Sequence, residues 1–570
     1  MDVSPGRSGP SSGPSPNAVP GARRSLALSS SGVFLTSLAI QAAGVVASYA
    51  LYHNLQSQLG LLGLVQLYLI ISSSITGIGD LRIGTAYVFF VARGQSPEQA
   101  TGTYLALRLA MVAVGGGVLL LLGPLTSTGF TYAQTTLQLE VLAVFMALPL
   151  LWSFQTVYTQ LWIAKGDSLR GQYPLLVESL VRTPALVFMA FYDQTLVGLT
   201  LAYVLGAVAS TLVSFPTVWR VTRKFDYREA IRLFRYAWPL MGGLLLSYLA
   251  GNIPPFLVTY YLGSSNLAIF LGANAWRILA LSLPAAIATP LFPHLSGLHR
   301  QREYEAVRDG TWKALRYSAM LVIPGVLACV VYRANLLYIF TNGLVAASGQ
   351  TPLALLALSV IPASLAQIIG TALNAIGKQR LELYLTGIQV AVLLGMTVLL
   401  FQPFYLFNYA RPSAGAENGL IAASLAVLVS AIVGLVVNTV FMERLLAVRI
   451  QLLPVGRMSV AAVASFFAVA QLNHVIPVNR YYELAAGLTL GFAVYFLVIA
   501  ALGELTKEDV IFIGRSMGVP WRLTVTLAKL CWKHEATPVN TAAPGAATGL
   551  APLAEDDFGH DAKVPPESPG

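Results

Sequence analysis

The sequence contains few charged residues, and this scarcity limits the class of protein. Of its 570 residues, 11% are Asp, Glu, Lys or Arg, and 56% are hydrophobic. An average soluble protein carries roughly 25% charged residues, which cover the surface that meets water. The composition therefore excludes a soluble enzyme, a disordered protein and a fibrous one. The mean hydropathy of +0.68 indicates a polytopic membrane protein. An outer-membrane barrel is also excluded, because its strands alternate apolar and polar residues and give a much weaker hydropathy signal.

Residues that build metal and catalytic sites are also sparse. The two cysteines, Cys329 and Cys531, lie far apart, and the six histidines are scattered. This pattern provides neither a disulfide framework nor a CxxC metal site. The sequence also lacks a P-loop and an HExxH motif. We therefore expect no catalytic residues, no metal and no cofactor, and we do not expect an enzyme.

Long apolar runs predict the membrane-spanning helices. A helix needs about 20 apolar residues to cross the hydrocarbon core. Fourteen runs qualify, at approximately 33–52, 64–92, 100–122, 137–163, 172–192, 196–219, 236–262, 267–293, 314–332, 352–377, 381–402, 418–442, 458–476 and 482–502. The sequence therefore predicts an all-α protein with about 14 transmembrane helices. Glycines in the second run, and prolines at Pro254, Pro255, Pro284 and Pro290, predict tilted or broken helices that border a cavity.

Basic residues determine how the predicted helices are oriented. With the N-terminus inside, the inner segments contain 28 of the 35 Lys and Arg residues, the outer loops contain three, and four lie within the spans. Loops rich in Lys and Arg stay on the cytoplasmic side of a membrane. We therefore predict a multi-pass protein of the cytoplasmic membrane with both termini in the cytoplasm. The net charge of +10 then reflects topology, and no nucleic-acid partner is expected.

The same features divide the chain into segments. Ser, Gly and Pro dominate the two ends, which cannot bury enough apolar surface to order themselves. The basic stretch VTRKFDYREAIRLFRYAWP has arginines on one helical face, which is typical of an amphipathic helix on the inner leaflet. Two roles for this stretch remain as alternatives, which are contact with anionic lipid and binding of a partner. We predict a disordered tail at 1–30, an N-lobe at 31–219, a basic linker at 220–235, a C-lobe with accessory spans at 236–503, a membrane-surface helix at 504–535 and a disordered tail at 536–570.

Cysteine labelling tests this orientation. In a variant without the two native cysteines, a cysteine at position 411 should react with a membrane-impermeant maleimide added to intact cells. Cysteines at positions 224 and 540 should react only after permeabilisation, because the basic segments lie inside. Labelling of position 224 from outside would contradict the topology.

Six charged residues lie at membrane depth in the predicted spans. Such residues are costly there and mark a substrate path, an ion site or a buried pair. Glu178 and Arg182 have the i, i+4 spacing of an intrahelical ion pair. Asp80 and Arg82, two residues apart, would face different sides of a helix unless its glycines break it. Arg108 and Arg277 have no acid within one helical turn, so they either contact carbonyl groups or form an anion site.

The four arginines outnumber the two acids and favour an anionic substrate. Guanidinium groups match phosphate oxygens in pairs. We therefore predict an anion-binding cavity built from Arg82, Arg108, Arg182 and Arg277. Asp80 and Glu178 are the candidates for coupling to protons or sodium, and Asp80 is the better one if Glu178 is paired. Polar residues at helical spacing form either a cavity lining or a hydrogen-bonded helix contact, and these are Asn274, Gln367, Thr371 and Asn374.

Several segments together form a pattern that is typical of one family of membrane proteins. They are LFRYAWPLMGG from Leu233, Leu262-Gly263, Ala275-Trp276-Arg277-Ile278, Phe292-Pro293-His294-Leu295-Ser296, NAIGKQ from Asn374, and the glycine-rich stretch from Leu59 to Ala86. These segments resemble the polysaccharide transporter, or oligosaccharide flippase, family of the multidrug/oligosaccharidyl-lipid/polysaccharide (MOP) exporter superfamily. The resemblance covers about residues 33–515, and Phe270, where members commonly have a tyrosine, departs from the pattern.

The resemblance implies a fold and a function. It implies two lobes around a central cavity, and a flippase that moves a polyprenyl-(pyro)phosphate-linked oligosaccharide by alternating access. Arg277 matches a position that carries a cavity arginine in related flippases of lipid-linked precursors. The implied partners are this substrate, membrane lipids, and glycosyltransferases or a polymerase of the same pathway. A cation-coupled multidrug exporter of the same superfamily and a non-transporting scaffold of polysaccharide synthesis remain alternatives. A membrane polymerase would need a large charged outer loop, which the sequence lacks.

Overall fold

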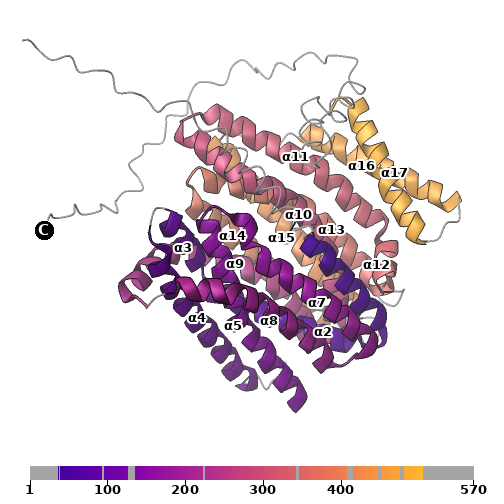
Figure 1. Ribbon diagram of the computed structural model, residues 1–570. Coiled ribbons are helices and arrows are strands. Elements are labelled where there is room, and N and C mark those ends of the chain that lie inside the picture. The colour runs from indigo at the N-terminus through magenta and orange to yellow at the C-terminus, as the bar shows by residue number, and fades with distance from the viewer. Residues whose placement is uncertain are drawn as a thin grey trace, which may run out of the picture. The chain divides into compact units, whose positions relative to one another are not determined.

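The computed structural model (Figure 1) describes most of the helical part of the chain. The described residues are 36, 39–92, 95–125, 135–222, 225–341, 346–406, 415–446, 452–475 and 480–504. The predicted tails 1–30 and 536–570, and the predicted surface helix from residue 505 onward, lie outside them. All contacts below lie within the unit Met1–Glu504.

Each of the fourteen predicted spans coincides with helical structure. Residues 39–54 form the first helix. The N-terminal half continues with α2 (Leu59–Asp80), α3 (Ile83–Ala92), α4 (Pro97–Leu125), α5 (Thr136–Ala164), α6 (Ser168–Gly171), α7 (Tyr173–Tyr192) and α8 (Leu196–Val221). The C-terminal half contains α9 (Tyr227–Leu262), α10 (Ser264–Arg300), α11 (Tyr304–Val331), α12 (Arg333–Thr341), α13 (Ala346–Ala375), α14 (Gln379–Leu406), α15 (Gly415–Leu446), α16 (Leu452–Val475) and α17 (Arg480–Ala501).

Length and composition support the membrane assignment. Eleven helices in the described residues are long and apolar enough to cross a membrane. The other three predicted spans correspond to residues 39–54, α4 and α10. No strand occurs in the part of the chain that the structure describes. The prediction of an all-α, multi-pass membrane protein is confirmed.

The second predicted span is broken, whereas the two helices that contain the predicted prolines are continuous. Helix α2 ends at Asp80 and α3 begins at Ile83. Between them, Leu81 and Arg82 have φ angles of 36° and 62°, a left-handed conformation that costs a non-glycine residue about 1–2 kcal/mol. Helices α9 and α10 run through their prolines without interruption, so the prolines do not divide these helices.

The helices pack into an N-terminal and a C-terminal group. In the first group, α2 packs against α4 and α5, α5 against α8, and α7 against α8. In the second group, α13 packs against α10, α11 and α15, and α14 packs against α15 (Figure 1). Helix α9 contacts α14 and α10 of the second group and also α2, α3 and α4 of the first. The division into an N-lobe at 31–219 and a C-lobe at 236–503 stays a prediction, and the two names are used below for these two groups of helices.

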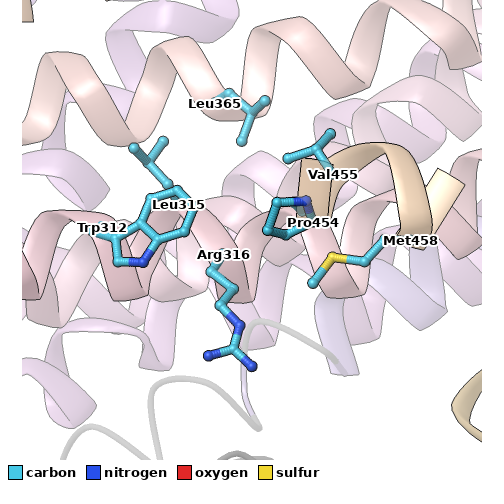
Figure 2. A pocket seen from close by; sticks show the side chains of 8 residues that line it. Trp312, Leu315, Arg316, Leu365, Pro454, Val455 and Met458 are labelled. Atoms are coloured by element: carbon cyan, nitrogen blue, oxygen red, sulfur yellow. The ribbon is translucent and has the colours of Figure 1, made fainter. Parts of the chain in front are cut away.

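The last two helices attach to the outside of the C-terminal group. Helices α16 and α17 lie side by side, and α16 packs against α11 (Figure 1). The Arg316 guanidinium, which points away from the apolar contact in Figure 2, donates to the carbonyl oxygen of Glu504. The Glu504 carboxylate pairs with Arg457 at 2.9 Å. The end of α17 is thereby fixed to α11 and α16. Figure 2 shows the apolar contact, formed by Trp312, Leu315, Leu365, Pro454, Val455 and Met458.

The two lobes touch at their predicted outer ends. A Cβ atom on Gly63 of α2 would lie 1.8 Å from the carbonyl oxygen of Ser264, the first residue of α10. The hydroxyl of Tyr52 donates to the carbonyl oxygen of Ala268 at 2.7 Å and accepts from Gln66 at 2.9 Å. Close backbone approach requires glycine at position 63. The lobes are therefore held together on the side that we predict to face outward.

Replacing Gly63 by alanine is expected to open this contact. The added methyl group cannot fit beside the Ser264 carbonyl, so the two helices must separate. A cysteine at Ala268, which is buried in this contact, should then react several times faster with a membrane-impermeant maleimide. Gly325→Ala is the matched control, because nothing lies within 4 Å of a Cβ atom at that position. Equal labelling rates in both variants would contradict the contact.

Candidate functional site

Arg108 is buried within the N-lobe and forms an ion pair with Asp80. One terminal nitrogen of Arg108 lies 2.8 Å from Asp80 Oδ1, and the side chains are 1% and 22% exposed. The other terminal nitrogen donates to Thr156 Oγ1 at 3.0 Å, and the Tyr104 hydroxyl donates to Asp80 at 2.7 Å. The break after α2 places Asp80 at the end of a helix, where its carboxylate can turn toward α4. Arg108 therefore already has an anionic partner.

Arg182 and Glu178 form the second ion pair of the N-lobe. Their side chains approach to 2.6 Å along α7, as their i, i+4 spacing predicts. Gln155 of α5 donates to the other Glu178 oxygen at 2.8 Å. The Arg182 guanidinium also lies over the ring of Tyr203, 5.8 Å from its centre. Both Glu178 oxygens are thus occupied by side chains of the protein.

Arg82 lies at the break between α2 and α3 and is exposed. It interacts electrostatically with Tyr248 of α9 and with Glu382 of α14. Tyr248 in turn packs against Gly77 of α2, where a Cβ atom would lie 1.8 Å from the tyrosine ring. Arg82 therefore stands on the side of the N-lobe that faces α9 and α14. It does not pair with its sequence neighbour Asp80, whose carboxylate is turned to Arg108.

Arg277 belongs to the C-lobe and is held by neutral groups. Its Nε donates to the Ser359 hydroxyl of α13 at 3.0 Å. A terminal nitrogen lies 3.4 Å from the side-chain oxygen of Asn274, one turn earlier on α10. The side chain is half-buried, and no ion pair to it occurs among the described residues. Its hydrogen-bond partners among the described residues are therefore neutral groups.

The predicted polar stripe lies on an open side of α13. Gln367 is exposed, and Thr371 and Asn374 are half-buried, whereas the residues between them are mostly buried. The Thr371 hydroxyl donates to the backbone carbonyl of Gln367 at 2.8 Å, not to another helix. On the neighbouring face, a Cβ atom on Gly370 would lie 3.0 Å from a carboxylate oxygen of Glu382.

The four arginines therefore fall into two kinds. Arg108 and Arg182 are paired with the two deep acids of the N-lobe, while Arg82 and Arg277 are not paired with them and lie on different lobes. Sequence reasoning missed the partners that the fold supplies from distant helices, which are Tyr104, Thr156, Gln155, Ser359 and Glu382. Of these, only Tyr104 could be found from the sequence, because it shares a helical face with Arg108 at i, i+4 spacing.

Comparison with known proteins identifies relatives that handle glycans. The family described as polysaccharide biosynthesis protein matches residues 62–342. A probable low-salt glycan biosynthesis flippase, Agl15 of Haloferax volcanii, is 22% identical over 324 residues, which are 56% of this chain and 62% of the relative. A putative O-antigen transporter of Shigella flexneri is 23% identical over 294 residues, covering 50% of this chain and 67% of the relative. The match thus spans less than two thirds of the length of the archaeal relative.

Solved structures share the fold at low sequence identity. The lipid II flippase MurJ in an inward closed conformation superimposes with a TM-score of 0.65 at 12% identity, covering 83% of this chain and 98% of MurJ. An inward-facing multidrug resistance MATE family transporter gives a TM-score of 0.56 at 16% identity, covering 71% and 95%. The fold is therefore that of MOP superfamily transporters. The family match, which covers just under half of the chain, and the glycan-related relatives show that the chain is similar to polysaccharide transporters and oligosaccharide flippases.

Proposed function

We propose that the protein is a flippase that moves a polyprenyl-(pyro)phosphate-linked oligosaccharide across the cytoplasmic membrane by alternating access. The observation that carries this proposal is Arg277, an arginine inside the C-lobe whose partners among the described residues are the neutral side chains of Ser359 and Asn274. A charge at this depth needs an anionic partner or water. Because the described protein supplies no such acid, we assign the partner to the substrate.

The charge balance supports a phosphate-bearing substrate. Asp80 and Glu178 neutralise Arg108 and Arg182, so these pairs leave no net charge. Arg277 in the C-lobe has no acidic partner among the described residues, and Arg82 in the N-lobe faces Glu382 of α14. A pyrophosphate group with several oxygens can accept from guanidinium groups of both lobes. The exposed polar stripe of α13 supports contact with the sugar, since such a face is costly against lipid tails.

The contact between the lobes supports a direction of entry. The lobes meet at Gly63 and Ser264 and at Tyr52 and Ala268, which belong to the predicted outer side. We infer that this state receives its substrate from the inner leaflet and that separation of these contacts accompanies release outside.

The proposed orientation has both termini in the cytoplasm, and the proposed lobes are residues 31–219 and 236–503. Glycosyltransferases or a polymerase of the same pathway remain the proposed partners.

A cation-coupled drug exporter is less consistent with these side chains. Such a protein requires acidic groups that can bind a cation, and both deep acids of the N-lobe are paired with arginine. A scaffold does not transport a substrate, so it would not need an arginine inside the C-lobe whose described partners include no acid.

Deletion of the gene tests the proposal. We expect loss of the surface glycan together with accumulation of the lipid-linked precursor in the inner leaflet, both restored by the wild-type chain. A scaffold role predicts loss of precursor synthesis instead, and a drug exporter predicts unchanged glycan with increased sensitivity to cationic compounds.

A further inference from the structure

The first part of α9 extends beyond its membrane span. The helix begins at Tyr227, while its apolar span is Met241–Leu262. The preceding segment, residues 227–240, is about 21 Å long at 1.5 Å per residue. It is continuous with the spanning helix, and it contains the end of the predicted basic linker.

This segment has three faces of different character. Leu233 and Ala237 are buried in a cluster with residues of α3 and α4, and Ala230 is also buried. The arginines lie on a second face. The third face is apolar yet open, with exposed side chains that are Tyr227 at 70%, Ile231 at 50%, Phe234 at 39% and Trp238 at 66%. Water contact with so much aromatic surface is unfavourable, so this face requires an apolar covering.

The apolar face forms part of a hollow of about 480 Å³ beside α4. The lining residues are Leu107, Tyr227, Ala230, Ile231, Phe234, Arg235 and Trp238. One cation, Arg235, is therefore placed within an otherwise apolar and aromatic surface. An amphiphile with a hydrocarbon chain and an anionic group fits this combination.

The arginines of the segment are not equivalent. Arg232 lies 4.4 Å above the ring of Phe90 in α3 and 4.0 Å from the Glu229 carboxylate. Its charge is therefore already compensated within the protein. Arg228 and Arg235 are exposed on the face next to the hollow. These two supply a positive field at the edge of the apolar surface, which selects negatively charged headgroups.

We propose that the hollow between α4 and the start of α9 is a binding site for an anionic phospholipid. The acyl chain covers Ile231, Phe234 and Trp238, and the headgroup phosphate meets Arg228 and Arg235. Because this segment joins the C-lobe helix α9 to the N-lobe helices α3 and α4, the lipid occupies a contact between lobes. The proposal is independent of the transported substrate.

Fluorescence quenching in reconstituted vesicles tests the site. The full chain is compared with Trp238→Phe, and the difference isolates Trp238 among the eight tryptophans. Brominated phosphatidylglycerol should quench this difference signal at a several-fold lower mole fraction than brominated phosphatidylcholine. Replacing both Arg228 and Arg235 by glutamine should abolish the preference. Arg380→Gln is the matched control, since Arg380 is exposed on another predicted inner segment, and it should retain the preference.

Three results would overturn the proposal. Equal quenching by both lipids shows that the face meets lipid without selecting charge. Quenching that needs an added polyprenyl phosphate assigns the hollow to the chain of the substrate. Absence of quenching by either lipid shows that the face is covered by protein.

Discussion

Replacing Arg277 by alanine is expected to weaken binding of a lipid-linked pyrophosphate about ten- to a hundredfold, because one charge-assisted hydrogen bond contributes about 1.5–3 kcal/mol. Ser359 and Asn274 keep the guanidinium oriented, so the lost group is pre-positioned. Arg277→Lys should have an intermediate effect, since it keeps the charge but not the paired donors. The measurements are binding of the purified precursor and complementation of a flippase-deficient strain at equal membrane expression.

Two further variants separate the charge of Arg277 from its surroundings. Ser359→Ala should weaken binding less than Arg277→Ala, since it removes only an orienting acceptor. Arg333→Ala is the matched control, because Arg333 donates to the carbonyl of Val330 at 3.0 Å in the predicted outer region and should bind and complement normally. Normal binding and transport by Arg277→Ala would show that this arginine is structural, and the anion-site model would be wrong.

Sequence periodicity predicts the helices well because each span must satisfy its own backbone in the membrane. The pairing of Glu178 with Arg182 is also predictable, because residues four positions apart lie on one face of a helix. The break between Asp80 and Ile83 was suggested by its glycines. By contrast, Pro254 and Pro284 do not interrupt their helices, because neighbouring structure can accommodate a missing hydrogen bond.

The pairing of Asp80 with Arg108 could not be predicted in this way. The two residues are separated by 28 positions and lie on α2 and α4, so their contact depends on how the helices pack. The same holds for Arg277 and Ser359, which are 82 positions apart. Charge counting therefore predicted an anionic substrate from four arginines, while the fold reduces the arginines not paired with a deep acid to Arg82 and Arg277.

Replacing Arg108 by glutamine is expected to destabilise the protein strongly. Arg108 is 1% exposed and Asp80 22%, and removal of one partner of a buried ion pair costs about 3–5 kcal/mol because it leaves an uncompensated charge. Asp80→Asn should be destabilising for the same reason, since it leaves Arg108 charged. Both single variants should show less folded protein in the membrane and a lower melting temperature in detergent. The double variant Asp80→Asn with Arg108→Gln should recover much of the loss.

The double variant also tests whether Asp80 couples transport to an ion gradient. If Asp80 binds the coupling ion, the double variant should transport without responding to an imposed proton or sodium gradient. If the pair only stabilises the junction of α2 and α4, the double variant should keep the response of the wild type. The control is the double variant Glu178→Gln with Arg182→Gln, which removes the other ion pair. If Asp80 binds the coupling ion, this control should keep the response of the wild type.

Normal accumulation and melting of Arg108→Gln alone would contradict the buried pair itself, because an unpaired Asp80 carboxylate cannot remain in that position without cost.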